Sequence, residues 1–278
     1  MLYDKISLMY KIKKHWKKIL VSLLIIIVVS VITAVWIKSK TVLSPVIPKT
    51  NQLSLNKENS SKKVIEEQKT VEKPIVVTPS RFDKSMYSTT DPTSIWIVTN
   101  KQHPLVPINY APIDLVNSVG ATISTKALTD FDAMNNAALA AGVNFTIVSS
   151  YRSYDTQNYL YNNYVTTYGQ AASDTFSARP GYSEHQTGLA IDFGSSTGSV
   201  CNLDDCFGST NEGSWLAQHA YEYGFLLRYP SNKQQIAGYK SEPWHFRYIG
   251  KDLALEMKIN SFSTLEEYFG ISGGETYL

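Results

Sequence analysis

The stretch GYSEHQTGLAIDFG, residues 181–194, contains the pattern that decides the fold. Within it, the apolar run Gly188–Phe193 predicts a short buried strand, which we expect Gly194 to end. Asp192 lies near the end of this strand. A carboxylate in so apolar a run needs a partner when it is buried, and a metal ion is one of the few adequate partners.

A second stretch, EPWHFRY at residues 242–248, predicts a neighbouring strand. The run WHFRYI from Trp244 to Ile249 is rich in aromatic and apolar residues, which favour strands. Pro243 keeps the preceding residue, Glu242, in an extended conformation. Two adjacent strands are therefore expected to supply the two halves of one site.

The polar residues of these two stretches are those of a zinc site. His185, Asp192 and His245 offer two imidazole nitrogens and one carboxylate oxygen, and Glu242 adds a second carboxylate. A catalytic zinc takes three protein ligands and leaves its fourth position to water, so a further acidic group beside it is a candidate general base. The sequence therefore predicts a zinc site held by the two histidines and the aspartate, with Glu242 as the base.

The motif SxHxxGxAxDF, followed further along the chain by ExxH, resembles the VanY-type D-alanyl-D-alanine carboxypeptidases of bacterial cell walls and the related LD-carboxypeptidases. The segments Ile95–Val116 and Val148–Tyr161 resemble other parts of the same family, so that the resemblance covers Thr93–Phe269. It implies that His185, Asp192 and His245 are the metal ligands and that Glu242 is the catalytic glutamate. It also implies that Arg152 is the arginine that polarises the substrate.

The resemblance implies a zinc-dependent carboxypeptidase that removes the C-terminal D-alanine from peptidoglycan stem peptides, with a preference for the D-Ala–D-Ala bond. Two alternatives stay open: an LD-carboxypeptidase acting on tetrapeptide stems, and a cell-wall-binding module without catalysis. An exopeptidase must recognise a free carboxylate through donors in a closed pocket. We expect Gln157, by family analogy, and Ser183 and Tyr151, by position, to contact substrate, and Trp244 to form a wall.

The implied fold is α+β, a compact domain in which a mostly antiparallel sheet carries the zinc and helices pack against it. Arg152 follows a predicted strand and precedes a helix that Ser153 or Asp155 caps, which directs it into a crevice. The predicted helices are Thr125–Ala141, the capped helix ending near Tyr168, and Ser214–Tyr223; the further strands are Asn144–Ser149 and Phe225–Tyr229.

The amino-terminal part has the pattern of a membrane anchor. Met1–Lys18 is a basic segment with six lysines and one acidic residue, and Ile19–Ile37 follows without a charge. A helix of that length spans roughly 28 Å, close to the hydrocarbon thickness of a bilayer. We expect a single-pass protein of the cell membrane with residues 1–18 in the cytoplasm and the catalytic domain outside it. A long cleaved signal peptide is the alternative.

Composition divides the rest of the chain at about residue 92. Residues 38–92 are polar and of mixed charge, which predicts a disordered linker, and residues 93–278 form the zinc carboxypeptidase domain. Residues 1–92 carry 16 basic and 7 acidic side chains, whereas residues 93–278 carry 10 and 17. The acidic domain has no basic stripe for a nucleic-acid backbone, so we expect no nucleic-acid partner. We expect a monomer.

Cys201 and Cys206 are the only cysteines, and they lie five residues apart between the two predicted ligand strands. In an oxidising compartment they are expected to form a disulfide that closes a small loop. A second metal site is the alternative, for which one such pair without partner ligands is weak support.

Overall fold

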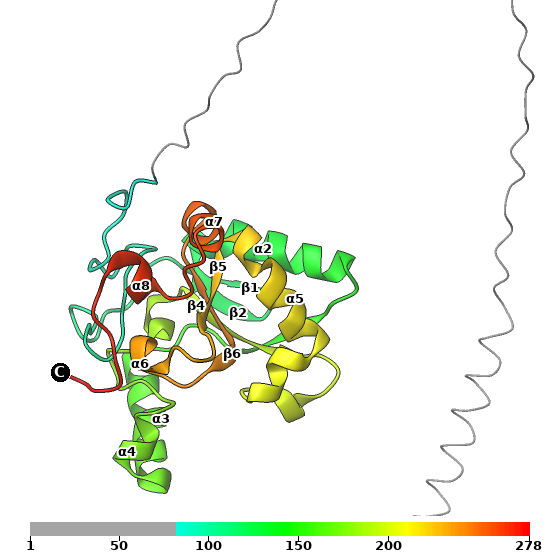
Figure 1. Cartoon of the computed structure of the whole chain (residues 1–278). Helices are drawn as coiled ribbons and strands as arrows, with labels where there is room; N and C mark the ends of the chain where they lie inside the picture. The colour runs from blue at the N-terminus through cyan, green and yellow to red at the C-terminus, as the bar shows by residue number, and fades with distance from the viewer. Residues whose placement is uncertain (1–81) are drawn as a thin grey trace, which may run out of the picture. The chain divides into compact units, whose positions relative to one another are not determined.

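Four antiparallel strands lie at the centre of the structure, a computed structural model that describes residues 82–278 (Figure 1). They are hydrogen-bonded in the order β3–β4–β6–β5. A separate hairpin of two short strands precedes them. The strand bounds are β1 Leu115–Ser118, β2 Ala121–Ser124, β3 Phe145–Ser149, β4 Ala190–Ser195, β5 Phe225–Tyr229 and β6 Glu242–Tyr248.

Helices flank the sheet. Figure 1 shows α2, α5 and α7 grouped beside it, whereas α3 and α4 extend away from it. The helices are α2 Thr125–Ala140, α3 Tyr154–Tyr168, α4 Gln170–Ser173, α5 Asn211–His219, α6 Gln234–Ala237, α7 Lys251–Ile259 and α8 Leu265–Phe269. Four 3-10 helices lie between them: η1 Glu184–Thr187, η2 Ser199–Cys201, η3 Asp205–Ser209 and η4 Ala220–Tyr223. The predicted α+β class and antiparallel sheet are confirmed.

The main hydrophobic core lies between the sheet and α2. Phe131 of α2 is fully buried and packs against Phe193 of β4 and Phe225 of β5, with ring centroids 6.5 and 6.3 Å apart. Phe193 in turn meets Phe246 of β6 at 5.6 Å. Aromatic side chains bury large apolar areas and so dominate the energetics of such a core. This core fixes one face of β4 and β6, which leaves their other face for polar side chains.

Strand β4 begins and ends later than the sequence predicts. Gly188 has a left-handed backbone (φ +70°) at the end of η1, so the strand begins at Ala190. Gly194, expected to end the strand, lies inside it. A Cβ at this position would lie 2.6 Å from the side-chain oxygen of Asn202, so the glycine permits a close approach of the neighbouring loop instead of a turn.

Strand β6 includes Pro243, although the strand is internal in the sheet. The first residue of β6 that pairs with β4 is His245, opposite Asp192, so Pro243 lies outside that pairing and its missing N–H leaves no bond to β4 unmade. Glu242 is paired with Tyr229 of β5. The extended backbone expected at Glu242 is therefore present, and the strand starts two residues before Trp244.

The described residues that precede Thr93 pack against the domain. Phe82 and Tyr87 contact the buried Trp96, with ring centroids 5.6 and 4.9 Å apart. The ammonium group of Lys84 donates to the carbonyl oxygen of Tyr268 at 2.6 Å. These contacts extend the folded part to Phe82, inside the range that composition assigns to the linker.

The predicted localisation is contradicted. No helix within residues 82–278, the part of the chain that the structure describes, has the length and apolar character needed to cross a membrane. The expectation of a single-pass cell-membrane protein with an extracytoplasmic catalytic domain is therefore corrected. The segments predicted as 1–18, as the span 19–37 and as most of the linker 38–92 lie outside the described residues.

Substitution of Phe131 by alanine tests the core. Because Phe131 is fully buried between two strands, Phe131→Ala is expected to lower the free energy of unfolding by about 3–5 kcal/mol. Leu139→Ala on the same helix is the matched control, since Leu139 is 50% exposed and should change the stability by less than about 0.5 kcal/mol. Chemical denaturation of both variants measures the difference. Equal losses would contradict this location of the core.

Candidate active site

The register of the central strands brings two of the predicted ligands together. Asp192 of β4 and His245 of β6 are Cα partners in the antiparallel pair, so their side chains point to the same face. On the other side of β4, Asp192 pairs with Ser149 at the end of β3. His185 comes from η1, which directly precedes β4. Three separate elements therefore meet at Asp192.

The three predicted ligands offer nitrogen and oxygen atoms that lie within 4.8 Å of one another. Nε2 of His185 lies 3.1 Å from Oδ2 of Asp192, and Nδ1 of His245 lies 3.1 Å from Oδ1 of the same carboxylate. All three side chains are buried. Ligands at zinc–nitrogen and zinc–oxygen bond lengths stand about 3.3 Å apart in a tetrahedral site. The spacing of the two nitrogens from the carboxylate therefore fits a zinc ion.

The chemistry of the donors also fits a cation. Nδ1 of His185 lies 2.7 Å from the carbonyl oxygen of Ser150, which can only accept, so Nδ1 carries the proton and Nε2 presents its lone pair to Asp192. Burial lowers the pKa of His185 despite the opposing effect of Asp192, which keeps the ring neutral. Oδ1 of Asp192 is buried without a hydrogen bond. Two facing acceptors and an orphaned carboxylate oxygen are favourable when a cation lies between them.

Glu242 lies at the edge of this group. Its Oε2 is 3.5 Å from Nδ1 of His245. Burial, together with repulsion from Asp192 and Glu184, raises the pKa of Glu242 to about 8. Burial alone would lower the pKa of His245, but the carboxylates of Asp192 and Glu184 outweigh it and raise that pKa to about 9. The negative charge of Asp192 beside the two imidazoles therefore favours a divalent cation.

Arg152 lies beside the metal-binding group, with Nη2 3.7 Å from Oδ2 of Asp192. It donates from Nη1 to Oε1 of Gln157 at 2.8 Å and from Nη2 to Oγ of Ser149 at 2.7 Å. Gln157 is buried, and its amide also donates to the carbonyl oxygen of Ala178 at 2.7 Å. Gln157 is not among the residues that line the cavity described below, and its contact with substrate stays a prediction.

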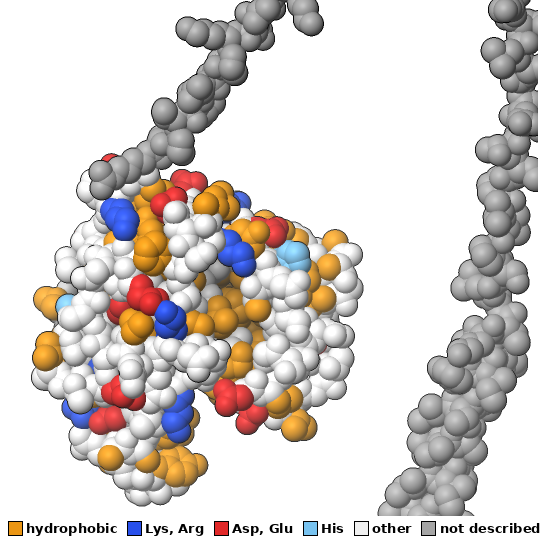
Figure 2. Space-filling model, in the orientation of Figure 1, with side chains coloured by type: hydrophobic (Ala, Val, Ile, Leu, Met, Phe, Trp, Pro, Cys, Tyr) orange, Lys and Arg blue, Asp and Glu red, His pale blue; other side chains and the backbone are white. Residues whose placement is uncertain are grey.

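A cavity of about 340 Å³ opens over these side chains. Figure 2 shows this face hollowed between the projecting α3–α4 segment and the segment around η2 and η3. Ser183, expected to contact substrate, and Trp244, expected to form a wall, line the cavity; Tyr151 is not among its lining residues, and its contact with substrate stays a prediction. The lining includes Arg152, Leu160, Tyr164, Phe176, His185, Asp192, Tyr229, Tyr239, Lys240, Glu242 and His245.

One wall of the cavity comes from the loop between β4 and α5. Cys201 and Cys206 are joined by a disulfide across this loop. The loop presents Leu203 and the two acidic residues Asp204 and Asp205 to the cavity. The disulfide therefore restrains a segment that faces the cavity, and both cysteines are used within it.

Sequence reasoning missed three groups that support the site. Glu184 directly precedes His185 and is fully buried against His245, and Ser149 holds Arg152. The carbonyl of Ser150 orients His185, and no side-chain type predicts such a contact. The acidic residue next to a ligand histidine was a usable signal for Glu184, because a buried carboxylate needs nearby partners.

Two histidines, an aspartate and a spare glutamate in one cavity are the groups of a metal-dependent hydrolase. The model of the VanY D-alanyl-D-alanine carboxypeptidase family matches residues 120–251, which contain all of these groups. The chain is 42% identical over 189 residues to the putative carboxypeptidase YodJ of Bacillus subtilis, covering 64% of this chain and 68% of the relative. It is 32% identical over 212 residues to a D-alanyl-D-alanine carboxypeptidase of Enterococcus faecium, covering 76% and 62%.

Solved structures agree with this match. The LdcB LD-carboxypeptidase superposes with a TM-score of 0.59 at 42% identity, covering 65% of this chain and 88% of that one. The D,D-pentapeptidase VanY from a VanB-type resistance cassette, solved with Zn(II), superposes with a TM-score of 0.54 at 31% identity. This match covers 62% of this chain and 97% of that one. The chain therefore belongs to the VanY carboxypeptidase family, and it is a zinc carboxypeptidase by class.

Zinc is expected to stabilise the folded chain, because the ligand atoms converge only when η1, β4 and β6 are in place. Free zinc at 100 times its dissociation constant should add about 2.7 kcal/mol to the free energy of unfolding. The gain should shrink as the pH falls below about 9, because protonation of His245, whose pKa is raised to about 9, competes with metal binding. Thermal unfolding with zinc or with a chelator measures it, and unfolding curves that coincide would contradict the site.

Proposed function

We propose that the protein removes the C-terminal D-alanine from peptidoglycan stem peptides, with a preference for the D-Ala–D-Ala bond. The observation that carries this proposal is the cavity in which Glu242 and Arg152 stand beside a cluster of two histidines and an aspartate. Membership of the VanY family supports the reaction class, and the E. faecium relative carries the name of this activity.

In this proposal His185, Asp192 and His245 hold the zinc ion through the atoms that converge in the cavity. When bound, zinc supplies a Lewis acid that polarises the scissile carbonyl and activates a water molecule. The two histidines differ in how they are fixed. His185 is oriented by the carbonyl of Ser150, and His245 has a second partner in Glu184.

Glu242 is the proposed proton carrier. Its carboxylate accepts a proton from the attacking water and returns it to the nitrogen of the departing D-alanine. A group that must accept and release one proton near neutral pH works best with a pKa near that pH. Burial raises the pKa of Glu242 toward this range, and its place in the cavity wall gives it access to a bound peptide.

Arg152 is the proposed electrostatic partner of the carbonyl oxygen. A guanidinium fixed in advance stabilises negative charge that develops during attack, because it need not reorganise at that moment. Gln157 and Ser149 supply this fixation by accepting from both of its terminal nitrogens. Ser183 and Trp244 line the same cavity and are the proposed contacts to the peptide.

Cleavage of an L-Lys–D-Ala-type bond in tetrapeptide stems is the second candidate. It is favoured by the match to the LdcB LD-carboxypeptidase, whose identity to this chain exceeds that of the D,D-pentapeptidase. Both reactions use the same metal site, so the choice depends on the cavity walls.

Substitution of the proposed base tests the mechanism. Glu242→Gln should lower kcat by about 10²- to 10⁴-fold, because the amide cannot accept the proton, while the chain keeps about one zinc ion. His245→Ala is the matched variant, and it should lose both zinc and activity. Metal analysis and D-alanine release from a D-Ala-D-Ala peptide give the two readouts. Normal turnover by Glu242→Gln, or no turnover by the zinc-loaded parent chain on any stem peptide, contradicts the proposal.

The bond preference needs its own measurement. The whole chain, loaded with zinc, is incubated separately with pentapeptide and tetrapeptide stems, and free D-alanine is quantified. The proposed function predicts kcat/KM higher by at least about tenfold for the pentapeptide, a difference of about 1.4 kcal/mol in transition-state binding. Release of D-alanine from the tetrapeptide alone would replace the DD assignment by the LD one.

A further inference from the structure

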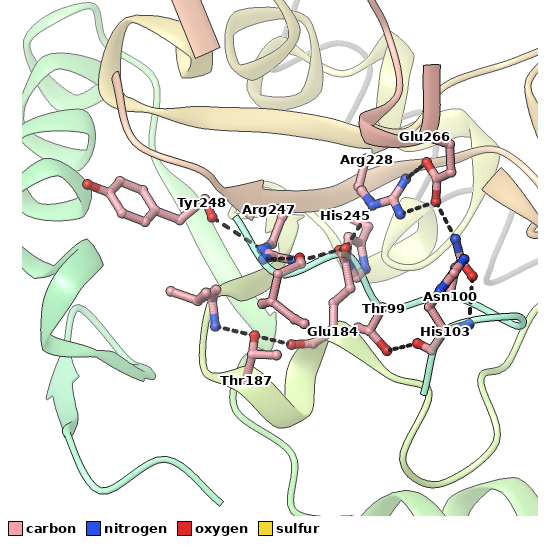
Figure 3. Close-up of polar contacts among 12 residues, drawn as sticks. Thr99, Asn100, His103, Glu184, Thr187, Arg228, His245, Arg247, Tyr248 and Glu266 are labelled. Carbon is pink, nitrogen blue, oxygen red and sulfur yellow. Dashed lines mark hydrogen bonds and ion pairs between the residues drawn. The ribbon is translucent and has the colours of Figure 1, made fainter. Parts of the chain in front are cut away.

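We propose that Glu184 is a positioning residue that fixes which nitrogen of His245 faces the metal. Oε2 of Glu184 lies 3.4 Å from Nε2 of His245 (Figure 3). A carboxylate in an ion pair accepts only, so Nε2 carries the proton and Nδ1 presents its lone pair. Nδ1 is the atom that lies 3.1 Å from Asp192. The inference depends on the proposed function only for the identity of the metal ligands.

The position of Glu184 is set by two arginines. Nε of Arg228 and Nη1 of Arg247 each donate to Oε1 of Glu184 at 2.8 Å. Both guanidinium groups are fully buried. Because the two arginines bond the same oxygen, Oε2 is left for His245. The carboxylate is therefore held by charge-assisted bonds on one side and aimed at the imidazole on the other.

The arginines are themselves fixed from elements far from the site. Arg228 donates from Nη1 and Nη2 to the two oxygens of Glu266 in α8, at 2.9 and 2.7 Å. Arg247 donates from Nη2 to the carbonyl oxygens of Ile97, at 2.8 Å, and Ile95, at 3.2 Å. Figure 3 shows this chain of contacts running from Glu266 through Arg228 to Glu184 and His245.

The network is balanced in charge without the histidine. Two arginines face two glutamates, so neither guanidinium needs His245 as a partner. A buried ion network of this kind is often no more stable than a well-packed apolar group of the same volume. Stability alone therefore does not explain why one oxygen of Glu184 points at a ring whose other nitrogen faces Asp192. The need to orient that ring explains this arrangement.

Aromatic contacts complete the support of His245. Its ring lies 4.9 Å from the ring of His185 and 4.9 Å from that of Tyr229, between centroids. These contacts restrict the tilt of the imidazole but do not distinguish its two nitrogens. Glu184 is the group that does. A carboxylate behind a metal-bound imidazole typically accounts for a 10- to 100-fold difference in metal affinity.

Zinc affinity is the test, measured by competition with a chromogenic chelator on the whole 278-residue chain. Glu184→Gln is expected to raise the zinc dissociation constant by about 10- to 100-fold. Glu266→Gln is the matched control, because it cuts the same network at its far end, and it should lower Tm while leaving the zinc dissociation constant within about threefold. Unchanged zinc affinity in Glu184→Gln, or equal weakening in both variants, would overturn the inference.

A second measurement does not require any variant to fold. Imidazole ¹⁵N shifts of the zinc-loaded, ¹⁵N-histidine-labelled parent chain report the state of each ring nitrogen, and the chain has only five histidines. We expect Nδ1 of His245 to be metal-bound and Nε2 to be protonated. The reverse assignment would refute the role of Glu184. A parent chain that binds no zinc would instead overturn the proposed function and the inference with it.

Discussion

The structure around the site depends on the pairing of Asp192 with His245 across β4 and β6. Side chains alternate along a strand, so a slip of one residue would turn Asp192 toward the aromatic core and Phe193 toward the cavity. The register is therefore fixed twice, by the apolar face packed on Phe131 and by the polar face that binds the ligand. The fold and the site are specified by the same few hydrogen bonds.

This arrangement concentrates charge in a buried region, and the molecule offsets it in two ways. Behind His245, Arg228 and Arg247 compensate Glu184 and Glu266 within the protein. In front of it, the single guanidinium of Arg152, 3.7 Å from Asp192, faces the two carboxyl groups of Asp192 and Glu242. The uncompensated negative charge faces the cavity, where a divalent cation and a peptide carbonyl enter. Because the network behind His245 is neutral, the negative charge of the site lies on the side that faces the cavity.

The sequence predicted what short-range pattern determines. These residues occur in two compact motifs on or directly before apolar strands, so His185, Asp192, His245 and Glu242 could be recognised together. The partners of those residues were not found, because they are distant in the chain. Glu184 meets Arg228 across 44 positions, and nothing local predicts which buried arginine it will face. The contact between Gln157 and Arg152 was not predicted for a related reason, since a glutamine in a first helical turn does not reveal which neighbour its amide will meet.

The residues that can select the substrate bond lie in a different part of the molecule from the residues that form the metal site. The metal site is made by strands and by η1, whereas the cavity walls come from α3 and the segment after α4, with Leu160, Tyr164 and Phe176, and from the disulfide loop, with Leu203, Asp204 and Asp205. These segments are neither part of the zinc motif nor paired in the sheet. A wall that varies while the ligands stay fixed changes which peptide fits without changing the reaction. We therefore expect the bond preference of this protein to depend on those two segments, and exchanging them should alter it while the metal ligands and Glu242 stay in place.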